Sequence, residues 1–465
     1  MTDSASIFSA AAEAAVAAIA EYLDASAAGH ERVVDPQSVS ALLAELGVER
    51  WTETGGMDPM ALRTFLAQYL KRSTKLHDPH FLAHQVAVPH PVSAIADLIA
   101  GITNNGMAVY EMGPPAVALE QAMVRWLLRQ VPWPDGSGVL THGGSVANLT
   151  ALLCARAHAS NNAWRQGVAA RSLAVLAPQS SHYSTARAVA VMGLGTDAVI
   201  PIGTDDVGRI VPDQLGVALR RARADGRRPI AVVANACSTS AGLYDPLRAV
   251  GEFCRAEEIW FHVDGCHGAG ALLSPELRAR MDGIELADSL AWDAHKMLRT
   301  SVLCAAVLFR APRAAAQTFQ QQAVYFDEAR DQERPNLFPL ALECTKSALG
   351  LKLFLVLAAL GERGLRAHVE GAYRRTAAFH RQIVERPGFE CPTAPDANIL
   401  LFRYGTENGL QERIRQALVA EGRFYLSSTM LGSRRYLRMV VMNDATNEAH
   451  IAALLARIEQ LAAAG

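Results

Sequence analysis

Two features of the sequence could take part in a ligand site. One is a turn with two glycines that could bind a phosphate, and the other is a histidine that could present an aromatic ring. Thr141–Asn148 contains two glycines and a serine where a strand-like run gives way to a helical one. Exposed N–H groups at such a helix start form an anion site that suits phosphate, and glycine lets the ligand approach closely. The alternative is an ordinary turn with Ser145 as the N-cap, and the motif alone favours that turn. His182 follows the strand-like run 173–177 and, alone, is interpreted as a loop histidine.

Two charged residues also follow apolar strand-like runs. Asp264 ends the run 259–263, where a carboxylate needs a partner or water. It could serve a ligand or cap the following turn. Lys296 follows the run 289–292 and is costly in apolar surroundings unless it is paired or covalently engaged. Lysine is the residue that forms Schiff bases, although a surface lysine is a reasonable interpretation of this segment in isolation.

Together, these four features are much more specific than any one of them. They occur in the order that would place a phosphate site, a flat ring, a carboxylate and an amine at the ends of parallel strands. Pyridoxal phosphate requires this set. Its phosphate needs N–H groups, its ring needs a flat neighbour, its pyridine nitrogen needs a carboxylate that keeps it protonated, and its aldehyde needs an amine.

Strand-like runs and helical stretches alternate from residue 138 onward. This alternation predicts an α/β fold with a mostly parallel sheet and helices on both faces, with ligands at the carboxyl ends of the strands. The predicted strands are 139–142, 173–177, 198–202, 230–234, 259–263, 289–292 and 302–309, and the helices between them are 145–159, 184–192, 212–224 and 246–257.

The pattern along the chain suggests three regions. Residues 1–75 form a helical N-terminal segment, 76–360 a large cofactor-binding domain, and 361–465 a small C-terminal domain. The last of these alternates again between strands and helices, which predicts a second, smaller α/β unit. Its predicted strands are 398–402 and 436–442, its helices are 408–421 and 446–463, and a long helix over about 345–385 precedes them.

Composition excludes several classes of protein. Among 465 residues, 44 are Lys or Arg and 46 are Asp or Glu, so there is no basic surplus for nucleic acid or an anionic membrane. Seven scattered cysteines, none spaced C-x-x-C, indicate a reducing compartment. The four histidines between 77 and 90 and the pair His262 and His267 lack the spacing of metal ligands, so we expect no metal site. The start of the chain does not read as a secretory signal, and we expect a cytoplasmic protein.

The sequence resembles the pyridoxal-phosphate-dependent group II amino-acid decarboxylases, which act on glutamate, 2,4-diaminobutyrate and aromatic amino acids. The resemblance runs from about His77 to the C-terminus, and the first 75 residues share only a helical character. Seven blocks carry it, in order: Asp78-Pro79-His80-Phe81, Asn105-Gly106-Met107-Ala108-Val109-Tyr110-Glu111, Gly143-Gly144-Ser145-x-Ala147-Asn148, His182, His262-Val263-Asp264, Asp293-Ala294-His295-Lys296-Met297 and Tyr436-Leu437-Arg438-Met439-Val440-Val441.

The resemblance implies a fold-type-I enzyme that is a homodimer with its active site at the subunit interface. It implies three catalytic residues. Lys296 would hold the cofactor as an imine, Asp264 would pair with the pyridine nitrogen, and His182 would stack on the ring.

Five further residues receive binding roles from the resemblance. Gly144, Ser145 and His295 would hold the phosphate, and Ser238 would be a small hydroxyl near the cofactor. Arg438 would bind the α-carboxylate of the substrate, although a surface arginine at a strand end is the plainer interpretation of that residue alone.

The implied activity is α-decarboxylation of an acidic or short diamino L-amino acid to an amine and carbon dioxide. The main alternative is decarboxylation coupled to oxidative deamination, which gives an aldehyde. Members of the family usually have a tyrosine in a mobile loop, whereas 326–344 contains none and reads Pro335-Asn336-Leu337-Phe338 at the expected position. Tyr325 lies just before this stretch. A cofactor-free relative is disfavoured, because the lysine, aspartate and histidine are all present.

A second departure from the family is Gly265-Cys266-His267, where many members have alanine and then small or aromatic residues. Gly265 would remove a methyl group beside the cofactor ring and so change the shape of the substrate site.

Overall fold

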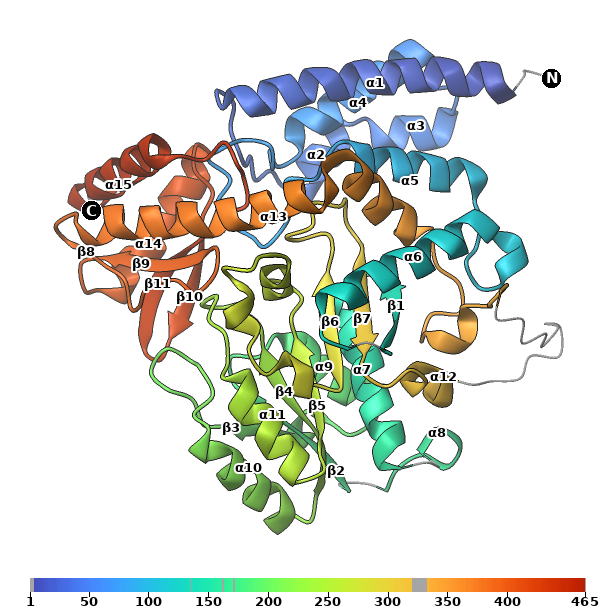
Figure 1. Cartoon of the computed structure of the whole chain (residues 1–465). Coiled ribbons are helices and arrows are strands. Elements are labelled where there is room, and N and C mark those ends of the chain that lie inside the picture. The colour runs from blue at the N-terminus through green and yellow to red at the C-terminus, as the bar shows by residue number, and fades with distance from the viewer. Residues whose placement is uncertain (1–3, 134, 161–162, 170–171, 320–332, 465) are drawn as a thin grey trace. The chain divides into compact units, whose positions relative to one another are not determined.

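The computed structural model describes residues 4–133, 135–160, 163–169, 172–319 and 333–464. The chain forms two compact units (Figure 1). The larger unit contains Gln85–Thr376 and Thr393–Leu400, and the smaller contains Met1–His84, Ala377–Pro392 and Leu401–Gly465. The three-region division predicted from sequence differs from this grouping, in which the N-terminal helices share a unit with most of the C-terminal region.

The larger unit is built on a seven-stranded sheet. Strand β7 (Ala305–Phe309) runs antiparallel to its neighbours β1 (Ser137–Thr141) and β6 (Ser289–Asp293). The other neighbouring pairs of the described sheet are parallel, which confirms the mostly parallel sheet. In spatial order the strands are β1 (Ser137–Thr141), β7 (Ala305–Phe309), β6 (Ser289–Asp293), β5 (Trp260–Asp264), β4 (Arg228–Asn235), β2 (Leu173–Pro178) and β3 (Val199–Ile202).

Continuous apolar runs form the central strands because both faces of the sheet are covered. Every residue of β2, β5, β6 and β7 is buried. The register places Asn235 of β4 beside Asp264 of β5, and Asp264 beside Ala291 of β6. The carboxyl ends of β4, β5 and β6 are therefore adjacent, and Asp264 and Asp293 lie at this edge of the sheet.

The helices of the larger unit pack around the sheet (Figure 1). Helix α7 (Gly144–Ala159) contributes Ala147, Ala151 and Leu152 to a core shared with Val175 of β2 and Val233 of β4. Further bounds are α5 (Val92–Thr103), η1 (Tyr110–Met112), α6 (Pro114–Gln130), α7 (Gly144–Ala159), α8 (Ala163–Gln166), α9 (Tyr183–Val191), η2 (Thr196–Ala198), α10 (Asp213–Ala224), α11 (Leu247–Ala256), η3 (Gly268–Leu273), η4 (Arg278–Met281), η5 (Ile284–Leu286), α12 (Ala314–Phe319) and η6 (Phe338–Leu340).

The long helix α13 (Leu349–Val384) belongs to the larger unit up to Thr376 and is interrupted at Gly361. There φ is 64° and ψ is 172°, a conformation that glycine adopts without steric cost and that breaks the helical hydrogen-bond pattern.

The smaller unit combines N-terminal helices with a C-terminal sheet. The sequence predicted the strands β9 (Ile399–Tyr404) and β11 (Arg434–Val440) and the helices α14 (Asn408–Glu421) and α15 (Glu448–Ala463). It did not predict β8 (Phe389–Glu390), which has two residues, or β10 (Ser427–Leu431), which carries polar residues. The sheet order is β10 (Ser427–Leu431), β11 (Arg434–Val440), β9 (Ile399–Tyr404) and β8 (Phe389–Glu390). The helices are α1 (Ser4–Ala28), α2 (Val39–Glu45), α3 (Val48–Thr54), α4 (Pro59–Arg72), α14 (Asn408–Glu421) and α15 (Glu448–Ala463).

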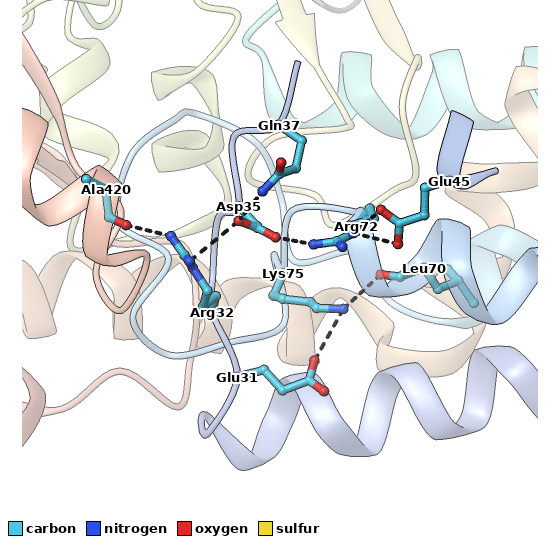
Figure 2. Close-up of polar contacts among 9 residues, drawn as sticks. All are labelled: Glu31, Arg32, Asp35, Gln37, Glu45, Leu70, Arg72, Lys75 and Ala420. Atoms are coloured by element: carbon cyan, nitrogen blue, oxygen red, sulfur yellow. Dashed lines mark hydrogen bonds and ion pairs between the residues drawn. The ribbon is translucent and has the colours of Figure 1, made fainter. Parts of the chain in front are cut away.

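Polar contacts tie the N-terminal helices together (Figure 2). Arg72, at the end of α4, bonds the carboxylates of both Glu45 and Asp35. Lys75 is buried, donates to Leu70 O at 2.8 Å and lies 3.4 Å from Glu31. Burial lowers the pKa of Lys75, although Glu31 opposes this effect. These charged groups fix the ends of the helices where few apolar side chains are buried.

Helix α1 is long and apolar enough to cross a membrane. A core helix or a signal sequence meets the same criteria of length and composition, so this property assigns no membrane role to α1.

Candidate active site

A cavity of about 300 Å³ in the larger unit collects six of the eight residues predicted from sequence. It lies where β5 and β6 end and where α7 and α9 begin. The six residues are Gly144, Ser145, His182, Asp264, His295 and Lys296. The sequence brings them together because successive strands of a parallel sheet end at the same edge.

The glycine turn that the sequence predicts to hold a phosphate runs from the end of β1 into the first turn of α7. Gly143 has a φ of 95°, which favours glycine. A Cβ on Gly144 would lie 2.4 Å from Cys266 Sγ and 2.8 Å from Asp293 Oδ1, so no side chain fits there. The backbone of α7 therefore begins in direct contact with Cys266 and Asp293, and its free N–H groups are available to an anion.

Asp264 is buried and its carboxylate is held by hydrogen bonds. Its Oδ2 accepts from Asn148 Nδ2 at 2.9 Å, and its Oδ1 accepts from Cys266 N at 3.2 Å. Burial would raise the pKa of Asp264, but the charge of Lys296, a hydrogen bond from the Cys266 side chain and the nearby histidines outweigh burial and lower it. Asp264 is therefore a carboxylate at neutral pH, as a partner for a protonated pyridine nitrogen must be.

Asn148 is a residue of this site to which the sequence assigned no role. Its Nδ2 also donates to Ser184 Oγ at 2.9 Å, and its Oδ1 accepts from His262 Nε2 at 3.0 Å. A signal was available, because Asn148 lies four residues after Gly144 and so faces the same side of α7. Asn148 links α7 to β5 and fixes the orientation of the Asp264 carboxylate.

His262 is held neutral beneath the site. Because Asn148 Oδ1 can only accept, His262 Nε2 carries the proton and Nδ1 accepts from Ser289 Oγ at 2.9 Å. Ser289 Oγ in turn accepts from Trp260 Nε1 at 2.8 Å. Burial lowers the pKa of His262 to about 4, despite the nearby charge of Asp264.

We expect His262 to make the protein less stable in acid. In the unfolded chain histidine titrates near its ordinary pKa of about 6.5, so between there and about 4 the unfolded state binds more protons. Stability is then lost as pH falls through this window. Between pH 7 and pH 5 the free energy of unfolding of wild-type apoprotein should fall by roughly 2 kcal/mol more than that of His262→Gln. Urea unfolding at both pH values measures this, and equal losses would show that His262 is not held neutral.

Lys296 lies in the cavity beside Asp293. Its Nζ is 2.9 Å from Asp293 Oδ2, and His295 Nε2 is 3.7 Å from the same oxygen. Burial would lower the pKa of Lys296, but Asp293, Cys266 and Asp264 together raise it. His295 is fixed through Nδ1, which lies 2.8 Å from Cys304 O.

His182 is the N-cap of α9 and presents a fixed ring. Ser184 N donates to His182 Nδ1 at 3.3 Å, and Ser184 Oγ lies 2.8 Å from the same nitrogen. Nδ1 therefore accepts, and Nε2 carries the proton of the neutral ring. Burial lowers the pKa of His182, although Asp264 opposes this effect. A neutral ring with both nitrogens defined suits a stacking role.

Two sequence-based expectations need correction here. Thr239, not the predicted Ser238, lines the cavity, because Ser238 Oγ accepts from Leu243 N at 3.2 Å and closes a turn. Gly265 does not make room beside a ligand, because its Cβ would lie 2.6 Å from Leu290 Cδ1 in the packed interior. Cys266 is the residue of that segment that lines the cavity together with His267.

The loop that bears on the reaction type is only partly described. Tyr325 and Phe326 lie outside the described residues. Leu337 is buried, and the N–H groups of Leu337 and Phe338 both donate to Ala108 O at 3.1 Å. Asn336 Oδ1 accepts from Tyr110 N at 2.9 Å. The segment after the loop is thus fixed against the residues that precede α6.

Arg438 lies on β11 of the smaller unit and is buried. Its Nη1 donates to Ala83 O at 3.0 Å and to Ser427 Oγ at 3.2 Å. Burial and then the charge of Arg438 lower the pKa of His84, whose Nε2 lies 2.9 Å from Tyr425 OH. Arg438 is therefore an oriented cation rather than a mobile surface side chain, and its role toward the substrate stays a prediction.

The donor set of the cavity fits pyridoxal phosphate. The turn at Gly144 leaves no room for a side chain but leaves N–H groups for a phosphate, Asp264 is an oriented carboxylate, and Lys296 supplies an amine. Asp293 Oδ1 is buried and has no hydrogen-bond partner among the described residues, which marks a place for a ligand.

Comparison with known proteins agrees with this chemistry. Residues 62–405 match the model of the pyridoxal-dependent decarboxylase conserved domain. The chain is 27% identical over 453 residues to L-2,4-diaminobutyrate decarboxylase of Acinetobacter baumannii, covering 92% of this chain and 88% of that protein. It is 30% identical over 414 residues to cysteine sulfinic acid decarboxylase of Mus musculus, covering 84% and 83%. The crystal structure of mouse CSAD superposes with a TM-score of 0.92 at 26% identity, covering 99% of both chains.

The matched domain spans well over half of the chain and includes every residue of the cavity described above. The protein therefore belongs to the pyridoxal-dependent decarboxylase family and is a pyridoxal-phosphate-dependent carboxy-lyase that acts on amino acids.

Proposed function

We propose that the protein removes the α-carboxylate of an acidic or short diamino L-amino acid and releases the amine and carbon dioxide. The observation that carries this proposal is the arrangement of Lys296, Asp264 and Asn148 around one cavity. The substrate class is supported by the names of the relatives, which act on 2,4-diaminobutyrate and cysteine sulfinic acid.

When bound, pyridoxal phosphate supplies an electron-accepting ring for the electrons of the bond that breaks. The residues of the chain determine which bond of the substrate breaks and which product then forms. With the cofactor bound, Asp264, oriented by Asn148, would hold a proton at the pyridine nitrogen, and the fixed ring of His182 would keep the flat ligand in place. We expect Arg438 to bind the α-carboxylate and so to orient the bond to be broken.

An aldehyde-forming reaction is the second candidate. The observation that favours it is the absence of tyrosine from 326–344, where a family member that forms an amine usually has one. Leu337 is buried and the backbone of Phe338 is bonded to Ala108 O. Near the end of the segment, Glu343 Oε1 lies 2.6 Å from Nδ1 of His142, which lines the cavity.

Product analysis distinguishes the two reactions and identifies the substrate. The holoenzyme is incubated with separate L-amino acids, among them glutamate, aspartate, cysteine sulfinate, 2,4-diaminobutyrate and aromatic amino acids. Mass spectrometry identifies the product while carbon dioxide, ammonia and peroxide are measured. We expect amine and carbon dioxide without peroxide from an acidic or diamino substrate. An aldehyde with ammonia and peroxide would overturn the amine-forming proposal, and turnover of aromatic substrates alone would overturn the substrate class.

A further inference from the structure

A second cavity of the larger unit lies at the opposite edge of the seven-stranded sheet from the candidate active site. It has a volume of about 480 Å³, compared with about 300 Å³ for the candidate active site. The first residues of β4 and β5 and the residue before β6 line this distal cavity, whereas Asp264 and Asp293 lie at the other ends of β5 and β6. A cavity of this size can hold a small organic ligand, and the proposed reaction gives it no role.

The walls of the distal cavity are largely apolar and aromatic. Ile230 and Ile259 are buried, and Trp260 is 7% exposed. The ring of His158, in the last turn of α7, lies 5.6 Å from the Trp260 ring at an interplanar angle of 59°. Such walls favour a ligand with a flat, apolar body, because that body removes apolar area from water and packs well on aromatic rings.

Five charged side chains also line the distal cavity, and two of them neutralise each other. Arg310 Nη2 donates to Asp288 Oδ1, and Arg310 Nε donates to Ala287 O at 3.0 Å. The second oxygen of Asp288 accepts from Phe261 N at 2.8 Å. This pair is therefore complete without a ligand.

Two other arginines can bind an anion in the distal cavity. Arg228 uses only Nη1, which donates to Ala159 O at 3.1 Å, within the described part of the chain. Arg255, in the last turn of α11, is exposed and forms no hydrogen bond or ion pair with a described residue. Glu258 opposes a ligand with several negative groups. Three arginines and two carboxylates leave one positive charge in excess, so a ligand with a single carboxylate fits.

A chain of hydrogen bonds connects the wall of the distal cavity to the candidate active site. Trp260, His262 and Asp264 alternate along β5 and therefore lie on one face of the sheet. Trp260 Nε1 donates to Ser289 Oγ at 2.8 Å, and Ser289 Oγ donates to His262 Nδ1 at 2.9 Å. His262 Nε2 donates to Asn148 Oδ1 at 3.0 Å, and Asn148 Nδ2 donates to Asp264 Oδ2 at 2.9 Å. Each group donates to the next, so a displacement of the Trp260 ring changes the bonds that orient the Asp264 carboxylate.

We propose that the distal cavity binds a monocarboxylate with a flat, apolar body and that this ligand regulates the active site. The carboxylate of the ligand bonds Arg228 and Arg255, and its body packs on Trp260. Binding displaces the Trp260 ring, and the hydrogen-bond chain transmits the displacement to Asp264, which is expected to pair with the pyridine nitrogen of the cofactor.

Calorimetry with 2-naphthoate tests the binding step. This compound has a flat, fused ring system and one carboxylate, and 2-naphthamide has the same rings without the charge. Full-length holoenzyme, in which the cofactor occupies the active site, is titrated with each compound. We expect 2-naphthoate to bind at one site per chain and more tightly than the amide. Arg255→Gln should raise the Kd of 2-naphthoate by about tenfold or more, because a hydrogen bond between two charged groups is lost.

Arg221→Gln is the matched control for the binding step. Arg221 lies in the last turn of α10, is exposed and does not line the distal cavity. The Kd of this variant should stay within about twofold of wild type. Three results would overturn the proposal: no binding of 2-naphthoate to the wild type, equal affinity for the amide, or an unchanged Kd in Arg255→Gln. The first two require no variant and so do not depend on its folding.

The absorbance of the bound cofactor tests the transmission to the active site. Trp260→Phe keeps an aromatic ring in the wall of the distal cavity but lacks the N–H group that donates to Ser289. We expect saturating 2-naphthoate to change the absorbance of the wild-type holoenzyme, and to change that of Trp260→Phe much less. Arg255→Gln retains Trp260 and should show the wild-type change only at higher concentrations of 2-naphthoate.

Two results would contradict the transmission through this chain. One is binding of 2-naphthoate to the wild type without a change in absorbance, and the other is an equal change in Trp260→Phe. Neither calorimetry nor absorbance uses a substrate, so both outcomes are independent of the proposed reaction.

Discussion

Lys296→Ala should abolish covalent attachment of the cofactor and lower decarboxylase activity by on the order of 10³-fold or more. Lys296 is the lysine that lines the cavity, and its Nζ is held by Asp293 at 2.9 Å. Without this amine the aldehyde has no partner in the site, and the substrate must react with a cofactor that is bound through its phosphate and ring alone. Borohydride reduction followed by peptide mass spectrometry measures attachment, and carbon dioxide release measures activity.

Lys71→Ala is the matched control for this experiment. Lys71 lies in the last turn of α4 in the smaller unit and is exposed, so its loss removes a lysine without touching the cavity. The control should keep both the reducible bond and the activity. Retention of a borohydride-trapped cofactor on the Lys296→Ala protein would contradict the assignment of Lys296.

Asp264→Asn should lower kcat by roughly 10²- to 10⁴-fold while leaving the cofactor bound. The carboxylate accepts from Asn148 at 2.9 Å and from Cys266 N at 3.2 Å, and the net effect of its surroundings lowers its pKa. It is thus ionised at neutral pH and can hold a proton at the pyridine nitrogen. Asparagine has the same shape but no charge, so the ring would lose its capacity to accept electrons.

The measurement combines steady-state kinetics with the absorbance of the bound cofactor. Asp282→Asn is the control, because Asp282 is an exposed carboxylate that pairs with Arg248 on the surface. The control should differ from wild type by less than about twofold, since surface substitutions of this kind have small effects. A kcat for Asp264→Asn within about threefold of wild type would exclude Asp264 as the partner of the pyridine nitrogen.

Local pattern predicted much of the fold. The seven strands of the larger sheet all lie within a few residues of the runs 139–142 to 302–309, because buried parallel strands are continuous apolar segments and the sequence shows them directly. The start of α7 at Gly144 and the bounds of α14 also follow from local signals. Strands β8 and β10 were missed, because β8 has two residues and β10 lacks a continuous apolar run.

The tertiary structure decided how distant segments meet. Asn148 and Asp264 are 116 residues apart and contact each other only because α7 packs on the sheet beside β5. The antiparallel direction of β7, and the sharing of a unit between N-terminal helices and the C-terminal sheet, depend on such packing and not on residue patterns.

The sequence by itself determined which residues can do the chemistry, because side-chain type and the position of a strand end are local properties. It identified Lys296, Asp264, His182 and the turn at Gly144. Only the tertiary structure determined which neighbouring residues shift the pKa values of these groups. It showed that Thr239 lines the cavity in place of Ser238, that Gly265 faces Leu290, and that Asp293 packs directly on the turn at Gly144. Hydrogen bonding, burial and charge act through space, so they become known only when the segments that carry them are brought together.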